Sequence, residues 1–350
     1  MSKRRVQWID GIRGLAILWV LFVHAVTIFT PNENADFPGL LGKLLYGISG
    51  KLAVACCCVI LGYFASESRP IKFVSYAIKR SVPFMIQVLI IEVFHYVISL
   101  LLGPDSYMVR CNSFLLEPTP NIIKALLSDA LLLSEHLIPT FWCIDDFVLA
   151  SLLVFLMQLV LQKQKLWLAI TVTLTTVILL YLFGFVWLSA GVMGYLLRLL
   201  LKQKINIHPL FWSILLLPIP WLIRRGECPL TYFYNGIACL LLIYVVFQWP
   251  PCQKIFAFPP FAFSGTVALE AFMLHVPIFE LIRSLLSPLY SQFSLNTFHY
   301  ALLIIPAMIT AIGVAWLWHR YITSMISRIC QVFALRFERL SAKSNGQVQM

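Results

Sequence analysis

Residues 8–29 read WIDGIRGLAILWVLFVHAVTIF, and this apolar run decides the class of fold. A helix that crosses the roughly 30 Å hydrocarbon core of a bilayer needs about 20 apolar residues, which this run supplies. Asp10, Arg13 and His24 interrupt it. Ionisable groups inside a span are costly, so they indicate a functional site or a buried pair. The run is long and no small-residue cleavage site follows it, so we interpret it as a retained first span and not as a signal peptide.

The rest of the chain repeats this pattern. The 350 residues are 60% hydrophobic and 12% charged, which excludes a soluble enzyme because too much apolar surface would face water. Hydropathy predicts an all-α integral membrane protein, a bundle of about ten transmembrane helices. The apolar runs lie near 8–30, 39–65, 83–103, 141–161, 166–183, 184–201, 209–223, 232–250, 265–286 and 298–324.

Charge sets the expected orientation. The formal net charge is +11, from 26 Lys and Arg against 15 Asp and Glu. Most basic residues lie in short segments between apolar runs, including the predicted inner loop 66–82, so we expect contact with a membrane surface and not with nucleic acid. Both termini are predicted to be cytoplasmic. Residues 1–326 form the predicted transmembrane domain, and 327–350 form a basic tail expected to lie as a helix on the inner leaflet. No metal-binding spacing is present.

The ionisable residues of the first span are spaced so that they can act together. Arg13 and His24 are eleven residues apart, so they share a helix face at a separation of about 16 Å along the axis. Asp10 precedes Arg13 by three positions and is expected to neutralise it. Gly11 and Gly14 leave room for a close neighbour. A lone intramembrane histidine often only hydrogen-bonds a neighbouring helix, but the shared face with an arginine favours a site.

Two later spans carry further candidates. Glu270 and His275 are five residues apart, about 140° around a helix, so only one of them is expected to face the same cavity as the first span. Asp145 and Asp146 follow Trp142 at the start of the span near 141–161. Two adjacent carboxylates within a span are too costly to be idle, so at least one is expected to line a wet cavity.

Two stretches resemble the membrane acyltransferase-3 family. Residues 8–24 are similar to the family's opening, and Arg13 and His24 match its motif of an arginine and a histidine separated by ten residues. Residues 263–277, FSGTVALEAFMLHVP, look like the family pattern GxxSLExYLxHxP, with Phe272 in the usual tyrosine place. These matches occur in the family's order, which makes coincidence improbable.

Weaker matches lie between these stretches. Leu61–Phe64 and Lys79–Pro83 look like the family's inner loop, but the first arginine of its Arg-x-x-Arg pair falls at Ala77. The resemblance therefore leaves that function to Arg80, helped by Lys79.

A further match begins a middle span. Pro139–Ile144 is similar to the family's Trp-containing start of such a span, with Asp145 and Asp146 in place of its glutamate-rich continuation.

The resemblance implies an enzyme of the bacterial cytoplasmic membrane. Such enzymes transfer an acyl group, most often acetyl from acetyl-CoA, to a hydroxyl of a cell-surface or exported carbohydrate. Acetyl-CoA is then a substrate, and no bound cofactor is expected. Many relatives carry an extracytoplasmic esterase-like domain, so this chain is expected to act alone or with a separate extracytoplasmic partner.

Roles follow from what acyl transfer needs: an activated hydroxyl, a place for the developing oxyanion and a place for the donor's phosphates. His24 is the expected general base, with brief acceptance of the acyl group as the alternative. Glu270 is expected to orient it. Arg13, and Arg80 with Lys79, are expected to hold phosphates of coenzyme A. The remaining candidates for donor or acceptor binding are Asp10, Trp142, Asp145, Asp146 and His275.

Two other classes of function stay open at this stage. A transporter or flippase of a glycan or lipid-linked substrate would also need many spans with a few intramembrane charges, but it would not consume acetyl-CoA. A structural or sensory membrane protein does not explain the number of ionisable groups within spans. Within the enzyme class, other acyl donors and an amine acceptor also remain open.

Overall fold

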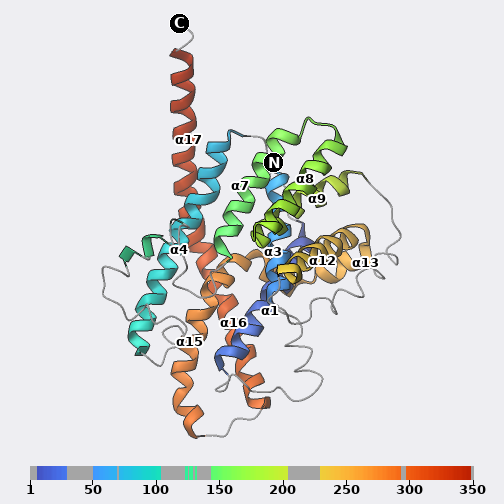
Figure 1. Cartoon of the computed structure of the whole chain (residues 1–350). Helices are drawn as coiled ribbons and strands as arrows, with labels where there is room; N and C mark the ends of the chain where they lie inside the picture. The colour runs from blue at the N-terminus through green and yellow to red at the C-terminus, as the bar shows by residue number, and fades with distance from the viewer. Residues whose placement is uncertain are drawn as a thin grey trace.

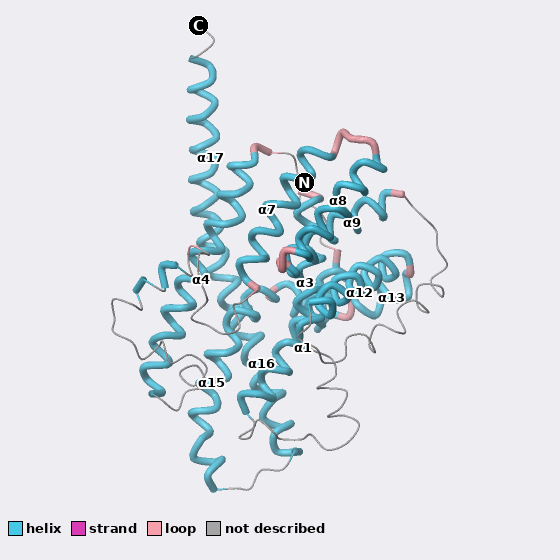
Figure 2. Tube along the Cα trace, in the orientation of Figure 1, coloured by secondary structure: helices cyan, strands magenta, loops and turns pink. Residues whose placement is uncertain are grey.

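The computed structural model of the chain consists of helices joined by short turns throughout the part that it describes (Figures 1 and 2). The described residues are 6–29, 50–68, 71–103, 143–203, 229–292 and 297–347, with a few positions between 123 and 131. The helices are α1 (Gln7–Phe29), α3 (Gly50–Ser66), α4 (Phe73–Leu102), α7 (Ile144–Leu161), α8 (Leu166–Leu182), α9 (Val186–Lys202), α12 (Pro229–Gln248), α13 (Pro250–Phe256), α14 (Pro259–Thr266), α15 (Ala268–Gln292), α16 (Thr297–Trp318), the π-helical η4 (His319–Thr323) and α17 (Ser324–Gln347).

The membrane character predicted from hydropathy is confirmed in part. Among the described residues, five helices are long and apolar enough to cross a membrane, and the number rises to six if the bent pair α14 and α15 counts as one span. Helices α3 and α8 are apolar but shorter. The predicted span 209–223 and the first part of 39–65 lie outside the described residues. Ten spans and cytoplasmic termini therefore stay predictions.

Helix α4 begins ten residues before the predicted span, at Phe73, so the predicted inner loop 66–82 is wrong over its second half. Hydropathy missed this start because Lys79 and Arg80 lower the window average, although neither residue prevents helix formation. Pro83 then lies inside the helix. Its carbonyl accepts a hydrogen bond from the buried side-chain amide of Gln87, at 3.1 Å.

Two predicted spans have different ends from those expected. The span near 265–286 is broken, because α14 meets α15 at 81° and the two helices are separated only by Val267. The span near 298–324 continues through η4 into α17 without a stop, so the boundary proposed at 326 falls within a helix. In Figure 1, α17 rises beside the start of α4 and extends past the rest of the bundle. The expectation that the tail lies on the inner leaflet stays a prediction.

Helix α1 lies at the centre of this arrangement because its glycines allow backbone contact. A Cβ atom at Gly14 would lie 1.8 Å from the carbonyl oxygen of Phe261, and one at Gly265 would lie 1.7 Å from that of Asp10. Only residues without a side chain permit this approach. The close neighbour expected at Gly11 and Gly14 is therefore the segment that contains α13 and α14. This packing brings the break before α15 next to Arg13.

Candidate functional site

A cavity of about 290 Å³ lies between α1, α3, α4, α7 and α15. Most of its wall is apolar, and it holds two guanidinium groups, those of Arg13 and Arg80. The apolar part includes Ile17, Val20, Val54, Ile60, Leu61, Phe64, Phe84, Phe147, Leu269 and Phe272. The cavity is at the small end of the range of about 300–1,000 Å³ that small-molecule sites occupy. It therefore suits an extended apolar ligand with an anionic group.

The two arginines reach the cavity from different helices. Arg13 Nη1 lies 3.6 Å from Asp10 Oδ1, which confirms the local ion pair expected from their spacing. Arg80 Nε donates to Ser151 Oγ at 3.2 Å, and that hydroxyl donates to the carbonyl of Phe147 at 2.7 Å. Only Arg13 has a carboxylate among these contacts, so the pair of arginines leaves the cavity with positive charge and free donors for an anion.

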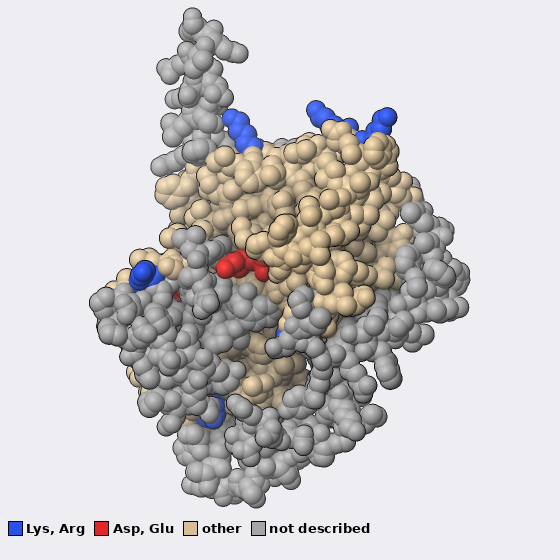
Figure 3. Space-filling model, viewed as in Figure 1, with Lys and Arg blue, Asp and Glu red and all other residues tan. Residues whose placement is uncertain are grey.

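One end of the cavity lies where α3 ends and α4 begins. Ser68 and Tyr76 line it there. The charge count predicts that this is the cytoplasmic side. The turn between α7 and α8 on the same side carries the exposed Lys163 and Lys165. Figure 3 shows Lys and Arg side chains along this upper edge of the molecule. A ligand entering here would meet basic residues before it reached the arginines.

His24 and His275 form a direct contact between α1 and α15. His24 Nδ1 lies 2.6 Å from His275 Nε2. His275 Nδ1 lies 2.7 Å from the carbonyl oxygen of Phe272 and 3.2 Å from that of Ala271. A carbonyl oxygen only accepts, so the neutral His275 carries its proton on Nδ1 and offers a lone pair at Nε2. His24 must then donate from Nδ1, which leaves the lone pair of His24 on Nε2.

This assignment gives His24 the form that a general base needs. Its Nε2 can take a proton, while its Nδ1–H is held by a ring that is itself held by a helix backbone. His275 is fully buried, so solvent does not compete for these hydrogen bonds. Of Glu270 and His275, His275 contacts the first span and Glu270 contacts His319, while neither lines the cavity.

The histidine pair lies just beyond the cavity. On α1 the last lining residue is Val20, and His24 follows one turn later on the same face. On α15 the last lining residue is Phe272, and His275 follows after nearly one turn. The cavity therefore leads from the arginines toward the histidines.

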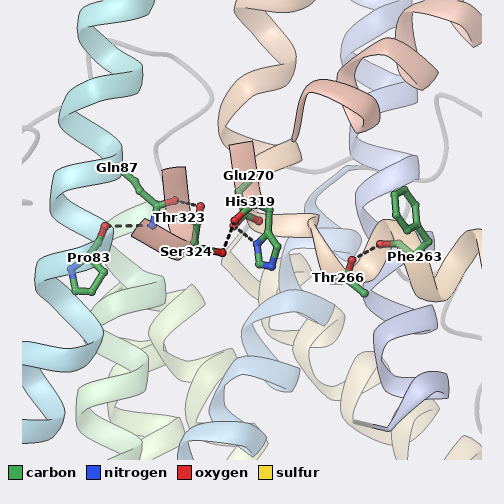
Figure 4. Close-up of polar contacts among 8 residues, drawn as sticks. All are labelled: Pro83, Gln87, Phe263, Thr266, Glu270, His319, Thr323 and Ser324. Carbon is green, nitrogen blue, oxygen red and sulfur yellow. Dashed lines mark hydrogen bonds and ion pairs between the residues drawn. The ribbon is translucent and has the colours of Figure 1, made fainter. Parts of the chain in front are cut away.

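Glu270 is not placed to orient His24, which corrects the role expected for it. Its Oε1 instead accepts a hydrogen bond from His319 Nδ1 at 2.7 Å (Figure 4). Spacing could not reveal this partner, because His319 lies at the polar end of the last apolar run and was not among the candidates.

The carboxylate–imidazole contact belongs to a polar cluster around the π-helical turn η4. Thr323 Oγ1 donates to Gln87 Oε1 at 2.7 Å, and Ser324 Oγ donates to the carbonyl of His319 at 2.9 Å. Figure 4 shows these side chains joining α4, α15 and the turn. The cluster ties three helices together beside the break before α15.

The remaining candidates lie away from the cavity or outside the described residues. Asp145 and Asp146 are half-buried in the first turn of α7, and neither lines the cavity. The residues of α7 that line it are Phe147 and Ser151. The expectation that at least one of the two lines a wet cavity stays a prediction. Lys79 also does not line it. Trp142 lies outside the described residues.

Comparison with known proteins places these features in a family. A family model described as an acyltransferase domain matches residues 6–320, nearly the whole chain. It covers both arginines and both histidines of the site. No curated protein and no solved structure matches the chain. The extent of the family match shows that this membrane protein belongs to the acyltransferase-3 family.

Proposed function

We propose that the protein is a membrane O-acyltransferase that moves an acetyl group from acetyl-CoA to a hydroxyl of a cell-surface or exported carbohydrate. Family membership supports an acyltransferase. The observation that carries the finer proposal is the His24–His275 contact at 2.6 Å, beyond the end of an apolar cavity that contains two arginines.

The cavity supports a path for the donor. A phosphate or pyrophosphate group would be held by the guanidinium groups of Arg13 and Arg80, which suit such anions. The cavity is too small for a whole acyl-CoA, so the nucleotide stays at the cytoplasmic mouth and the pantetheine arm occupies the apolar interior. The thioester then points toward the histidines, which explains how a cytoplasmic donor serves a base on the outer half of α1.

His24 supplies the base. Its Nε2 takes the proton of the acceptor hydroxyl as that oxygen attacks the thioester carbonyl. The carbon–sulfur bond then breaks, the new ester leaves with the acceptor, and the coenzyme A thiolate recovers the proton from the imidazolium. His275 acts as a positioning residue, because its lone pair at Nε2 holds the Nδ1 proton of His24 and keeps the reactive nitrogen turned away from it.

The test is the O-acetyl content of surface glycans, measured by mass spectrometry and NMR. Host cells lacking the gene are complemented with wild type, with His24→Ala or with the control His319→Gln. We expect acetyl to be lost on deletion and restored by wild type and by His319→Gln only.

Two results would contradict the proposal. Normal acylation by a well-expressed His24→Ala variant would show that His24 is not the general base. Unchanged acylation on deletion, with glycan precursor accumulating inside the cell, would indicate a transporter instead.

A further inference from the structure

The end of the cavity nearest the histidines has a wall of three buried apolar side chains, those of Val20, Phe147 and Phe272. They are 4%, 6% and 6% exposed respectively. The rings of Phe147 and Phe272 contact each other with centroids 6.0 Å apart, at an interplanar angle of 54°. The ring contact joins α7 and α15, and Val20 adds a side chain from α1 to the same cavity.

The end wall lies beside the histidine pair. The ring of Phe272 also contacts that of His275, with centroids 6.0 Å apart. Along α1, Val20 and His24 are four residues apart, which is about 6 Å of helix axis. A thioester that enters by the cavity therefore brings its acyl chain against these three side chains as its carbonyl approaches His24.

We propose that Val20, Phe147 and Phe272 set the length of the acyl group and restrict the donor to short chains such as acetyl. This inference rests on the proposed function and adds the acyl-chain specificity of the same site. Close-packed aromatic rings leave no volume for added methylene groups, and forcing such groups into a packed interior is unfavourable. An apolar pocket of this kind discriminates one methylene by about 10- to 200-fold.

The experiment measures donor preference by competition. Full-length protein in lipid nanodiscs receives an equimolar mixture of acetyl-, propionyl-, butyryl- and hexanoyl-CoA, together with the lipid and glycan extract of the host. Mass spectrometry follows the loss of each donor, which gives their relative kcat/KM values in one sample. Wild type is expected to consume acetyl-CoA fastest. Phe272→Ala is expected to raise the butyryl-to-acetyl ratio by about tenfold or more.

Phe279→Ala is the matched control. Phe279 is also buried and its ring also contacts that of His275, with centroids 5.7 Å apart, but it does not line the cavity. Both variants remove the same volume beside the same histidine. The inference requires the ratio to change for Phe272→Ala and to stay at the wild-type value for Phe279→Ala.

The outcomes separate the inference from the function on which it rests. If wild type consumes no acyl-CoA, the proposed function fails and the inference with it. If wild type is active but Phe272→Ala keeps the wild-type ratio, or both variants change it equally, only the inference is overturned. Phe272→Leu and Phe147→Leu, which remove less volume, give the same test with smaller changes should the alanine variant not fold.

Discussion

Two histidines of this protein make side-chain contacts that resemble parts of known catalytic sites, and the two contacts differ in where they lie. His319 meets a carboxylate, Glu270, at 2.7 Å, and His24 meets a second imidazole, that of His275, at 2.6 Å. By chemistry alone, the carboxylate–histidine pair is the better-known catalytic arrangement. By position, the histidine–histidine pair follows directly on the lining of the cavity. In the proposed function, position beside the cavity, and not the identity of the partner, favours His24 over His319 as the base.

The two pairs also differ in how far their side chains are buried. The His319 side chain is 40% accessible and is fixed to a π-helical turn, while its Glu270 partner is 4% accessible. His275 is fully buried and holds its ring against two backbone carbonyls of its own helix. We infer that the first pair stabilises the helix break before α15, and that the second pair orients a reactive nitrogen.

The largest effect is expected from His24. His24→Ala should lower the rate of acetyl transfer by about 10²–10⁴-fold, because it removes the base that takes the hydroxyl proton. Transfer from radiolabelled acetyl-CoA into host extract measures the rate. A thermal melting curve in detergent should remain close to that of wild type, which separates lost chemistry from lost folding. Retained transfer would break the comparison, because the two pairs could no longer be ranked by position.

His275 should show a smaller loss that depends on the replacement. His275→Leu removes the acceptor for the Nδ1 proton of His24, so we expect kcat to fall by about 10²-fold with little change in KM. His275→Gln offers a carbonyl oxygen to that proton and an amide to the helix carbonyls, so it should recover part of the rate. Steady-state kinetics of both variants test this prediction. Equal losses in the two variants would indicate a packing role only.

Arg13 should affect binding more than chemistry. Arg13→Lys keeps the charge but loses the planar fork, so we expect KM for acetyl-CoA to rise about tenfold, which is a loss of about 1.4 kcal/mol. Lys163→Gln, in the exposed turn after α7, serves as the control for general charge effects. An unchanged KM in Arg13→Lys would mean that this arginine only neutralises Asp10.

The smallest effect on turnover is expected at the other histidine pair. Glu270→Gln keeps an oxygen that can accept from His319, so activity should stay within about threefold of wild type. Glu270→Ala leaves the cluster around η4 without its acceptor and should lower the thermal midpoint, since a lost buried partner costs about 1–3 kcal/mol. Melting curves and transfer rates of both variants check this. A loss in Glu270→Gln as large as that in His24→Ala would reverse the ranking of the two pairs.

Local sequence patterns were sufficient for much of the fold. The run 8–29 predicts α1 to within one residue at its N-terminal end, because an apolar stretch of spanning length has few alternatives in a bilayer. The spacing of Asp10 and Arg13 predicts their ion pair, since residues three apart on a helix are neighbours. The start of α4 and the break at Val267 were missed, because hydropathy averages over a window and does not detect where a helix bends.

The family resemblance predicted more of the candidate site than residue spacing on a helix did. It pointed to Arg13, His24 and Arg80, and the structure places both arginines in the wall of one cavity with His24 beyond its end. The expectation that Glu270 orients His24 came from the requirements of acyl transfer, and the geometry does not support it. Spacing on a helix says which residues share a face, but it does not say which other helix that face meets.

The sequence by itself determined that this is a helical membrane protein of the acyltransferase-3 family with an arginine and a histidine on one face of its first span. Those properties depend on composition and on contacts within a single helix, which short-range spacing specifies. Only the tertiary structure decided that His275 and not Glu270 contacts His24, and that Phe147 and Phe272 meet in the lining of the cavity. These contacts join residues far apart in the chain, and they depend on how α1, α7 and α15 pack, with α1 held against α14 by glycines that allow their backbones to meet.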